Sequence, residues 1–562
     1  MNKPIDHEIR DEVLDPRSSF VVQAPAGSGK TTTLAKRIIH LLTVVDDPKE
    51  IIAISFTKKA AGEMHKKFLD EYIALENREV VKKINARAKK LKWNENFLNL
   101  LEIMTIDSLA SKITRQAPIF SGSLYKNITE DPYEIYEAAV KETMQDNTQL
   151  AELFPFLNYD YQKIKDQLIS LLKNRDQWRD NIFKYKYMGP TQIESKTKEY
   201  YKEETNIWVI KLKGLFENNE IKDIKNILTY LDSSFTQGED KITFWLIFRD
   251  LLMTKDGKIG KQFGLKKGFQ DDNEGKLYKK KLSDLLLLNP IRNNVLKELN
   301  NVIYEDKIAD IFPTVMHTAS IFLSELYVNL IQQFNLRSEL DYIQAVDNAI
   351  ITLKTTNVAI LFDENVSHIL VDEFQDTNNQ QKEFLELLTQ NFAGNPKKSF
   401  FAVGDPMQSI YRFRKAEVSI FKELQTKCKF GDIDLKVRNL QVNFRSNEKI
   451  INWLNKEYKK VFSNNDDADK GQLKYDPSSI SPKTQSIKGS GVQFHIYKNK
   501  IHDNYTEQQV EAKAVYDKIK DLRNIDKNIE IAVLVSARSH LSALLTQMRK
   551  DSFPIEATEI DS

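Results

Sequence analysis

Short apolar runs alternate with helix-type stretches near the start of the chain. Residues 19–23 (SFVVQ) and 51–56 (IIAISF) have the length and composition of buried strands. Residues 32–42 carry Leu and Ile at helical spacing, and residues 59–64 (KAAGEM) follow the second run in a similar way. Alternation of strands and helices is typical of a parallel sheet with crossover helices. The pattern therefore predicts an α/β fold for this part of the chain.

The pattern changes between about residues 120 and 335. Charged, helix-type stretches rich in Leu, Lys, Asp and Glu replace the strand runs there, for example over 161–172 and 291–299. Strand-type runs return at 368–371 and 399–403. We therefore expect a large, mainly helical insertion inside the first α/β domain.

A further α/β section is expected at the end of the chain. Residues 440–442, 492–497 and 529–535 are candidate strands. Residues 463–490 are rich in polar residues, Pro and Gly, a composition typical of a loop or a poorly ordered insertion.

Composition limits the class of protein. A chain of 562 residues exceeds a single core, so roughly three or four domains are expected. The first residues are polar and acidic, unlike a signal peptide, and no apolar run approaches the length that spans a bilayer. The single cysteine, Cys428, excludes an intrachain disulfide and a cysteine zinc cluster. We expect a cytoplasmic protein with no membrane partner.

Net charge adds little, because 82 basic residues stand against 80 acidic ones. Two segments, 76–93 and 254–282, are locally basic. A solvated face or loop explains such runs as well as nucleic-acid binding does.

A glycine-rich turn lies between the first predicted strand and its helix. Gly27 and Gly29 allow successive backbone N–H groups to surround phosphates, and Lys30 supplies a positive charge for the β- and γ-phosphates. The Thr31 hydroxyl can bind Mg²⁺. A chance glycine turn is the alternative. The predicted nucleotide-binding residues of this P-loop are Ala24, Pro25, Ala26, Gly27, Ser28, Gly29, Lys30, Thr31 and Thr32.

A pair of carboxylates, Asp372 and Glu373, directly follows the apolar run 369–371. Side chains at this position project from the carboxyl edge of a sheet, where α/β folds bind ligands. The first carboxylate suits Mg²⁺, and the second suits polarising the attacking water. In isolation such a pair would be an ordinary surface feature.

Two more segments fit a nucleotide site. Gln408 follows the strand run at 399–403, where its amide could sense a γ-phosphate. Arg445 lies in the string NFRS on a separate lobe and could stabilise charge on the transferring phosphoryl group. A surface arginine at a helix start is the alternative for Arg445.

Seven motifs in this order resemble the superfamily 1 DNA helicases of the UvrD/Rep type, and most closely the RecB/AddA-like branch. They span nearly the whole chain and read VVQAPAGSGKTTTLAKRI, AISFTKKAAGEM, MTIDSLASKITRQAP, HILVDEFQDT, AVGDPMQSIYRFRKAE, NFRSN and IAVLVSARSHL.

The resemblance implies two RecA-like P-loop NTPase lobes. The first lobe would comprise residues 1–120 and 336–428, with the helical insertion at 121–335. The second, incomplete lobe would comprise residues 429–562, including the loop at 463–490.

The resemblance also implies residue roles. Lys30, Asp372, Glu373, Gln408 and Arg445 would be catalytic, with Thr31 and Asp372 binding the metal. The implied nucleoside contacts are Arg37 and Phe444. The implied DNA-facing or coupling residues are Phe56, Thr57, Lys58, Thr105, Ile106, Asp107, Tyr411, Phe413 and Arg414. For Tyr411 and Phe413 core packing is the alternative, although stacking on bases suits aromatics flanked by arginines.

The activity implied is an ATP-dependent 3′–5′ DNA helicase or translocase of repair or recombination, with ATP and Mg²⁺ as cofactors. The implied partners are single-stranded DNA, junctions of single- and double-stranded DNA and, as one option, a nuclease or helicase partner subunit.

The sequence departs from the family pattern at two places. The usual glutamine motif that reads adenine is not evident, and Asp6 and Arg10 occupy that region. The fifth motif and the sixth motif, which carries a second arginine finger, do not occur. We therefore predict poor ATP hydrolysis by this polypeptide alone. An ATP-binding single-stranded-DNA-binding module that needs a partner chain, and an inactive fragment, stay open as alternatives.

Overall fold

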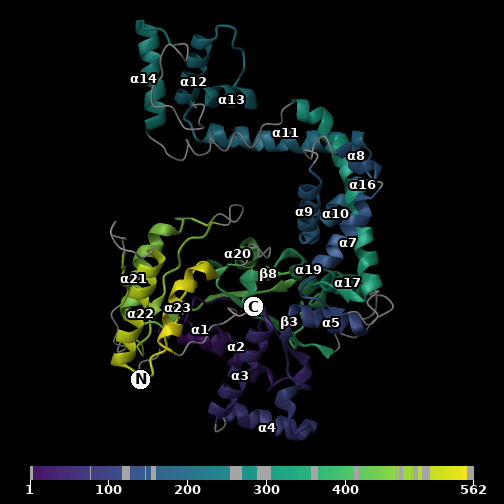
Figure 1. The fold of residues 1–562 in the computed structure, drawn as a ribbon, viewed down its shortest axis with the longest axis vertical. Coiled ribbons are helices and arrows are strands. Elements are labelled where there is room, and N and C mark those ends of the chain that lie inside the picture. The colour runs from purple at the N-terminus through teal and green to yellow at the C-terminus, as the bar shows by residue number, and fades with distance from the viewer. Residues whose placement is uncertain are drawn as a thin grey trace.

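A parallel sheet with helices on both faces forms the base of the molecule, and a helical arm rises from it (Figure 1). The structure is a computed structural model. It describes residues 4–75, 78–116, 127–145, 147–153, 160–252, 269–287, 306–355, 365–410, 417–463, 465–466, 472–482, 484, 491–496 and 507–553.

The sheet has six strands in the order β10-β1-β7-β6-β2-β3, and all neighbours are parallel. Every residue of β1, β2, β6 and β7 is buried, as expected for strands covered on both faces. The α/β fold predicted from the alternating pattern is confirmed. The strands are β1 (Phe20–Gln23), β2 (Ile51–Ser55), β3 (Glu102–Thr105), β6 (His368–Val371), β7 (Ser399–Gly404) and β10 (Lys436–Asn439).

Successive side chains of each strand enter opposite hydrophobic clusters. Val22 packs in the cluster with the helices α2 (Lys30–Leu41), α3 (Lys58–Ala74) and α4 (Glu79–Leu91). Val21 packs in the other cluster, which we call the sheet cluster, with α5, α17, α19 and α20. The bounds of these helices are α5 (Ile106–Gln116), α17 (Tyr342–Thr355), α19 (Asn379–Leu388) and α20 (Val418–Lys427).

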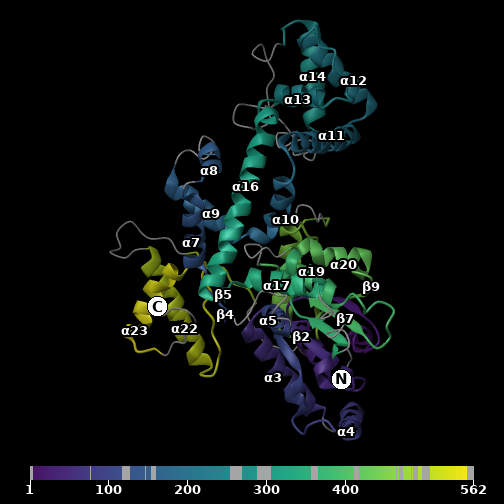
Figure 2. The ribbon, with the colours of Figure 1, turned by 90° about the vertical axis from the view of Figure 1, so that its right-hand side faces the viewer.

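The insertion between β3 and β6 is helical, and it forms the arm (Figures 1 and 2). Its lower part surrounds one cluster, which we call the arm cluster and which includes Phe322, Phe334 and Leu340. The helices of this part are α7 (Tyr133–Met144), α8 (Thr148–Leu153), α9 (Tyr161–Leu172), α10 (Arg175–Lys186) and the long α16 (Asp306–Arg337). At its base β4 (Asn127–Ile128) pairs with β5 (Glu339–Leu340).

The far part of the arm has its own core around Trp245, Phe244 and Phe248. Its helices are α11 (Pro190–Gly214), α12 (Asn218–Leu231), α13 (Ile242–Leu252) and α14 (Asn273–Leu287).

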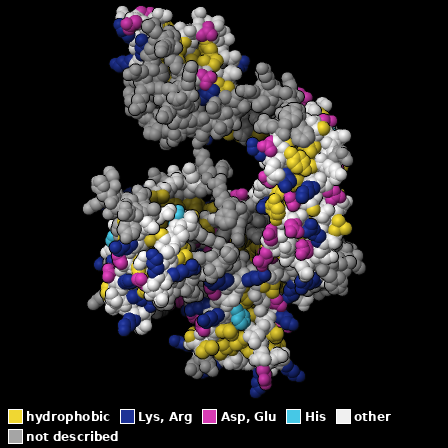
Figure 3. Space-filling view, viewed as in Figure 1, with side chains coloured by type: hydrophobic (Ala, Val, Ile, Leu, Met, Phe, Trp, Pro, Cys, Tyr) yellow, Lys and Arg dark blue, Asp and Glu magenta, His cyan; other side chains and the backbone are white. Residues whose placement is uncertain are grey.

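Basic and acidic side chains are interspersed over the face of the molecule that Figure 3 shows, in keeping with the net charge of +2. Among the described residues, no helix combines the length and the apolar character that crossing a membrane requires.

The first sheet and its packing continue past residue 429, where the first lobe was expected to end. β8 (Lys429–Phe430) pairs with β9 (Ile433–Asp434), and Phe430, Ile433 and Leu435 pack in the sheet cluster. β10 then joins the edge of the first sheet beside β1. Hydrophobic contacts and the pairing of β10 with β1 hold this segment against the first sheet, and the lobe boundary itself stays a prediction.

The C-terminal region contains α21 (Glu448–Val461), α22 (Glu507–Ile525) and α23 (Ser542–Lys550). The strand predicted at 440–442 is displaced to β11 (Val442–Asn443), which pairs with β12 (Ser479–Ile480) from within the predicted loop. Residues 491–496 and 529–535 form no strand, so those two predictions are wrong over the described residues. Phe494 and Leu534 are 78% and 92% exposed.

Candidate nucleotide site

The P-loop joins the carboxyl end of β1 to the N-terminus of α2, where free backbone N–H groups favour an anion. Gly27 and Gly29 have φ values of +77° and +86°, which side-chain-bearing residues rarely adopt. A Cβ atom at Gly27 would lie 2.7 Å from the Oδ1 atom of Asn443. The loop conformation therefore depends on glycine, as the sequence predicted.

A cavity of about 300 Å³ lies over this loop. It brings together the P-loop, the carboxylate segment and the two segments predicted to face the γ-phosphate. Its lining residues are Pro25, Ala26, Gly27, Gly29, Lys30, Thr31, Thr32, Glu373, Gln408 and Arg445. Ala24, Ser28 and Asp372 are buried beside it rather than in its lining.

A polar chain connects the floor of the cavity to β7. The Lys30 ammonium donates to Glu373 Oε2 at 2.7 Å, and the Gln375 amide donates to the same oxygen at 2.8 Å. Gln375 Oε1 accepts the backbone N–H of Asp405 at 2.9 Å. Glu373 has a left-handed backbone, with φ of +50°. The contacts of Gln375 hold the Glu373 carboxylate toward the P-loop.

The carboxyl groups at the strand ends are in surroundings that disfavour their charged forms. Burial and the neighbouring Glu373 raise the pKa of Asp372 to about 7, and burial raises the pKa of Asp376 to about 6. The Asp376 Oδ1 and Ser28 Oγ atoms are buried without a hydrogen-bond partner. A cation beside these groups would favour their ionised forms. The site therefore fits Mg²⁺, with Thr31 and Asp372 as the predicted protein ligands.

The geometry also limits how a metal could be held. Among the described residues, no group of three or more His, Cys, Asp or Glu side chains can enclose a metal ion. A magnesium site here would need further oxygen ligands from water and phosphate, as is usual for this ion.

Gln408 and Arg445 enter the cavity from two different segments, one after β7 and one after β11. Gln408 ends a short 3₁₀ turn, Pro406–Gln408, and its amide donates to the Asp405 carboxylate. Arg445 follows Asn443, whose Oδ1 accepts the N–H groups of Arg445 and Ser446, each at 2.8 Å. Both side chains line the cavity, and their contact with a γ-phosphate stays a prediction.

Asn443 was missed by the sequence interpretation. Its Nδ2 group donates to the Ala26 carbonyl at 2.9 Å, and the neighbouring Phe444 N–H donates to the Gly27 carbonyl at 2.8 Å. These contacts tie the NFRS segment directly to the P-loop. The signal available in the sequence was an asparagine placed directly after the predicted strand 440–442 and two residues before Arg445.

The N-terminal helix α1 (His7–Glu12) supplies a second tie. Arg10 donates to both Asp6 oxygens at 2.8 Å and to the Ser28 carbonyl at 2.8 Å. Asp6 Oδ2 also accepts the N–H groups of Gln441 and Val442, each at 3.1 Å. The Arg10 guanidinium lies 4.8 Å from the Phe444 ring centroid. The segment that lacks the glutamine motif thus contacts both the P-loop and the predicted nucleoside residue.

The nucleoside contact predicted for Arg37 is wrong. Its guanidinium is fully buried and donates to the carbonyls of Val13 and Ser18 at 2.5 and 2.7 Å. It also lies 4.6 Å from the Phe401 ring centroid, and burial lowers its pKa to about 9. Seven residues along α2 from Lys30, it is about 10 Å away along the axis. Arg37 therefore holds α2 to the sheet, whereas Thr32 reaches the cavity.

The predicted DNA-facing residues at the ends of β2 and β3 come together, because these strands pair with Ser55 opposite Thr105. Thr57 caps α3 by accepting the Ala60 N–H, and Thr105 Oγ1 accepts the Ser108 N–H. Burial raises the pKa of Asp107 to about 6.

The remaining members of this group differ in how far the structure places them. Phe56 is partly buried, Lys58 is exposed and Ile106 is buried. The predicted base-stacking residues Tyr411, Phe413 and Arg414 lie outside the described residues.

Comparison with known proteins agrees with the motif order. The family model for the UvrD/REP helicase N-terminal domain matches residues 5–429, and that for the UvrD-like helicase C-terminal domain matches residues 438–561.

Curated relatives include an ATP-dependent helicase/nuclease subunit from Clostridium kluyveri, 25% identical over 93% of this chain and 45% of the relative. The proteins of the same name from Clostridium botulinum and Thermoanaerobacter pseudethanolicus are 26% and 25% identical, over 91% and 88% of this chain. The alignments cover 44% and 43% of those proteins, so the chain spans less than half their length.

Proposed function

The chain belongs to the UvrD/REP helicase family, and from that premise we propose an ATP-driven motor that moves 3′ to 5′ along single-stranded DNA. The observation that carries the proposal is that Lys30, Glu373 and Arg445 all line one cavity over the P-loop. In this proposal the described sheet is the core of a first RecA-like lobe, and the region after residue 439 is part of a second.

We assign the nucleotide contacts as follows. The P-loop N–H groups and Lys30 would hold the phosphates, and Thr31 with Asp372 would hold Mg²⁺. The metal, when bound, would supply positive charge beside the phosphate oxygens. Lys30 now pairs with Glu373, so phosphate oxygens would replace Glu373 as its partner. The carboxylate would then be available to orient the attacking water.

Gln408 and Arg445 complete this assignment at the outer end of the cavity. Arg445 would stabilise charge on the transferring phosphoryl group, a contribution of roughly 10³–10⁵ in rate where an arginine acts in this way. Because Asn443 fastens the NFRS segment to the P-loop, Arg445 is positioned by the same loop that would hold the phosphates.

DNA would pass over the ends of β2 and β3. We propose that Phe56, Lys58 and Thr105 contact or couple to the strand, with Tyr411 and Phe413 as stacking platforms. The relatives are named as subunits of a helicase/nuclease, so we also propose a partner subunit for this chain.

A second candidate function is an ATP-binding, single-stranded-DNA-binding module that leaves unwinding to a partner chain. The exposed segments 492–496 and 532–535, which form no strand over the described residues, favour it, since strands of this composition are normally buried. The fifth and sixth family motifs do not occur in residues 1–562. We therefore propose that this polypeptide alone hydrolyses ATP slowly, even with single-stranded DNA.

Nucleotide binding and turnover by purified residues 1–562 test these proposals. We expect Mg²⁺-dependent binding of ATP, at least ten-fold weaker for Lys30→Ala and unchanged for the matched control Lys36→Ala on the same helix. Failure to bind ATP would contradict the nucleotide site. Rapid DNA-stimulated hydrolysis that Lys30→Ala abolishes would contradict slow turnover and favour the complete motor over the module.

A further inference from the structure

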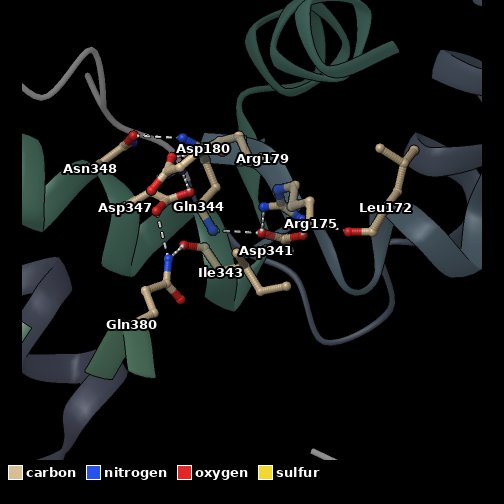
Figure 4. A network of polar contacts seen from close by, with 10 residues as sticks. All are labelled: Leu172, Arg175, Arg179, Asp180, Asp341, Ile343, Gln344, Asp347, Asn348 and Gln380. Carbon is tan, nitrogen blue, oxygen red and sulfur yellow. Dashed lines mark hydrogen bonds and ion pairs between the residues drawn. The ribbon is translucent and has the colours of Figure 1, made fainter. Parts of the chain in front are cut away.

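Two hydrophobic clusters meet at the start of α17, where the arm joins the six-stranded sheet and its covering helices, which together we call the motor. Leu340, at the end of β5, packs in the arm cluster, whereas Val346 and Ala349 on α17 pack in the sheet cluster. The seam between the clusters contains two ion pairs, one fully buried and one with a buried carboxylate and a partly exposed arginine (Figure 4).

The first ion pair lies at the N-terminus of α17. Arg175, the fully buried first residue of α10, donates to the two Asp341 oxygens at 2.6 and 2.5 Å. Tyr136 on α7 donates to the same carboxylate, which also accepts the Gln344 N–H at 2.8 Å. The Asp341 carboxylate at the start of α17 therefore holds two helices of the arm, α7 and α10.

The second ion pair lies one helical turn further along α10 and nearly two turns further along the chain at α17. Arg179 donates to Asp347 Oδ2, and the amide of Gln380 donates to Asp347 Oδ1 at 2.6 Å. Gln380 also donates to the Ile343 carbonyl at 3.1 Å. Asp347 is 2% exposed, and each of its carboxylate oxygens accepts a hydrogen bond, one from the arm and one from α19. The chain Arg179–Asp347–Gln380 links the arm to α19.

This link bears on the nucleotide site because α19 begins a few residues after Glu373. The helix begins after the cap residue Asn378, and Gln380 lies seven residues beyond Glu373 in the cavity. The short turn between them, Phe374–Asp376, is packed in the sheet cluster through Phe374. A displacement of the Glu373 segment would therefore be carried into α19 through a short, buried connection.

Burying two ion pairs is a poor way to gain stability. Removing two charges from water costs more than their attraction returns unless the geometry is excellent, and apolar replacements of similar size are often as stable. Hydrophobic contacts, by contrast, are non-directional and would permit the arm to slide on the motor. Hydrogen-bonded ion pairs with fixed partners specify one orientation.

We propose that the Arg175–Asp341 and Arg179–Asp347–Gln380 contacts form a joint that sets the orientation of the arm, with Asp347 as the positioning residue that ties it to the nucleotide site. α16 has 32 residues and is about 48 Å long at 1.5 Å per residue. A rotation of about 5° at the joint would move its far end by about 4 Å. The joint thus converts small changes beside Glu373 into displacements of the distal helices.

The coupling half of this proposal rests on the nucleotide binding proposed above, whereas the orientation half does not. Distances between two spin labels on the full chain test both. Cys428, the only cysteine of the chain, is exposed on the motor and takes one label. Asn219→Cys at the exposed start of α12 takes the other.

Gln380→Leu is the main variant, because it cuts the link from α19 and leaves Asp347 paired with Arg179. Lys354→Met is its matched control, because Lys354 pairs with Glu383 across the same two helices without contacting the arm. A second variant, Arg179→Met with Asp347→Leu, removes both charges together and avoids an unpaired buried charge.

We expect a single narrow distance distribution for the parent and for Lys354→Met. Gln380→Leu and the double variant should widen it at least two-fold while the melting temperature stays within a few degrees of the parent. Unchanged widths in both variants would overturn the joint.

The nucleotide arm of the experiment uses ATPγS with Mg²⁺, with binding measured on the same samples. Where ATPγS binds, the parent distance should shift and the Gln380→Leu distance should not. Binding without any shift in the parent would overturn the coupling. Absence of binding would contradict the proposed nucleotide site and leave the joint to be decided by the widths.

Discussion

β2 and the segment 531–535 show how one local pattern can have two outcomes. β2 reads IIAIS and the C-terminal segment reads IAVLV, so both favour a buried strand. Every residue of β2 is buried between β6 and β3, with helices on both faces. The second segment forms no strand among the described residues, and Leu534 is 92% exposed. An apolar run therefore specifies a strand only where neighbouring strands and covering helices are present.

The contrast extends to how each region holds its part of the cavity. Lys30 and Glu373 follow strands whose neighbours fix them by continuous ladders. Arg445 follows a two-residue strand, and its position depends on individual polar contacts from Asn443 and Asp6. The first region should therefore resist change at single residues outside its core, whereas the second should depend on a few side chains.

The largest expected effect tests the packing contrast directly. Phe400→Ala should destabilise the first lobe by about 3–5 kcal/mol, because the ring is fully buried and such truncations leave a cavity. It stacks on Phe430 with 4.1 Å between ring centroids. Phe494→Ala should cost less than about 0.5 kcal/mol, as expected for an exposed position. Urea denaturation of each variant measures the difference.

Equal losses from the two substitutions would contradict the contrast. A loss at Phe494 above about 1 kcal/mol would show that residues 491–496 are packed in solution. A conservative control, Phe400→Leu, should recover part of the stability that the alanine variant loses.

A pH series tests the strain at the carboxylates that end the strands of the first sheet. The pKa of Asp372 is raised to about 7, so the folded chain binds a proton that the unfolded chain releases near pH 4. The stabilising contribution of the protonated form is complete below pH 4 and is lost as the pH rises through 7. At pH 8 Asp372→Asn should therefore be more stable than the parent by up to about 4 kcal/mol, because the pKa differs by about three units between the folded and unfolded chains.

Thermal unfolding between pH 5 and 8 measures this effect. The parent should lose stability over that range more steeply than Asp372→Asn, and Mg²⁺ with ATP should reduce the loss in the parent alone. The exposed carboxyl variant Asp432→Asn is the control and should follow the parent. Parallel pH curves for the parent and Asp372→Asn would contradict the raised pKa.

Sequence reasoning found the parts of the site that are local in the chain. The glycines of the P-loop and the Asp372–Glu373 pair are short motifs whose chemistry can be read from residue type and spacing. The role that the resemblance implied for Arg37 failed, because matching a motif does not show that this side chain is fully buried. Sequence reasoning could not find the Arg175–Asp341 pair, whose members are 166 residues apart and are ordinary charged residues in sequence.

The fold was predictable to a similar depth. The α/β alternation and the helical insertion follow from periodicity, and the structure has both. The sequence did not show that β10 belongs to the first sheet, because the strand runs near residue 429 are short and only tertiary contact assigns β10 there. The failed strands at 491–496 and 529–535 have the same origin, since local pattern does not report neighbours.

The smallest expected effect concerns the contacts that hold Arg445. Asn443→Ala removes the acceptor for the Arg445 and Ser446 N–H groups and leaves the bond from Phe444 N–H to the Gly27 carbonyl in place. Losing hydrogen bonds of this kind costs about 1 kcal/mol. Hydrogen exchange of the peptide that contains residues 444–446 should therefore accelerate about five-fold, with the peptides of β1 and β7 unchanged.

The matched control for this substitution is Asn447→Ala, which removes the cap of α21 on the side away from the P-loop. It should accelerate exchange at the start of α21 and leave the amides of Arg445 and Ser446 protected. If Asn443→Ala instead accelerated exchange throughout β1, the two regions would unfold as one unit. The nucleotide cavity would then not consist of a rigid part and a separately fastened part, and the contrast drawn from burial would fail.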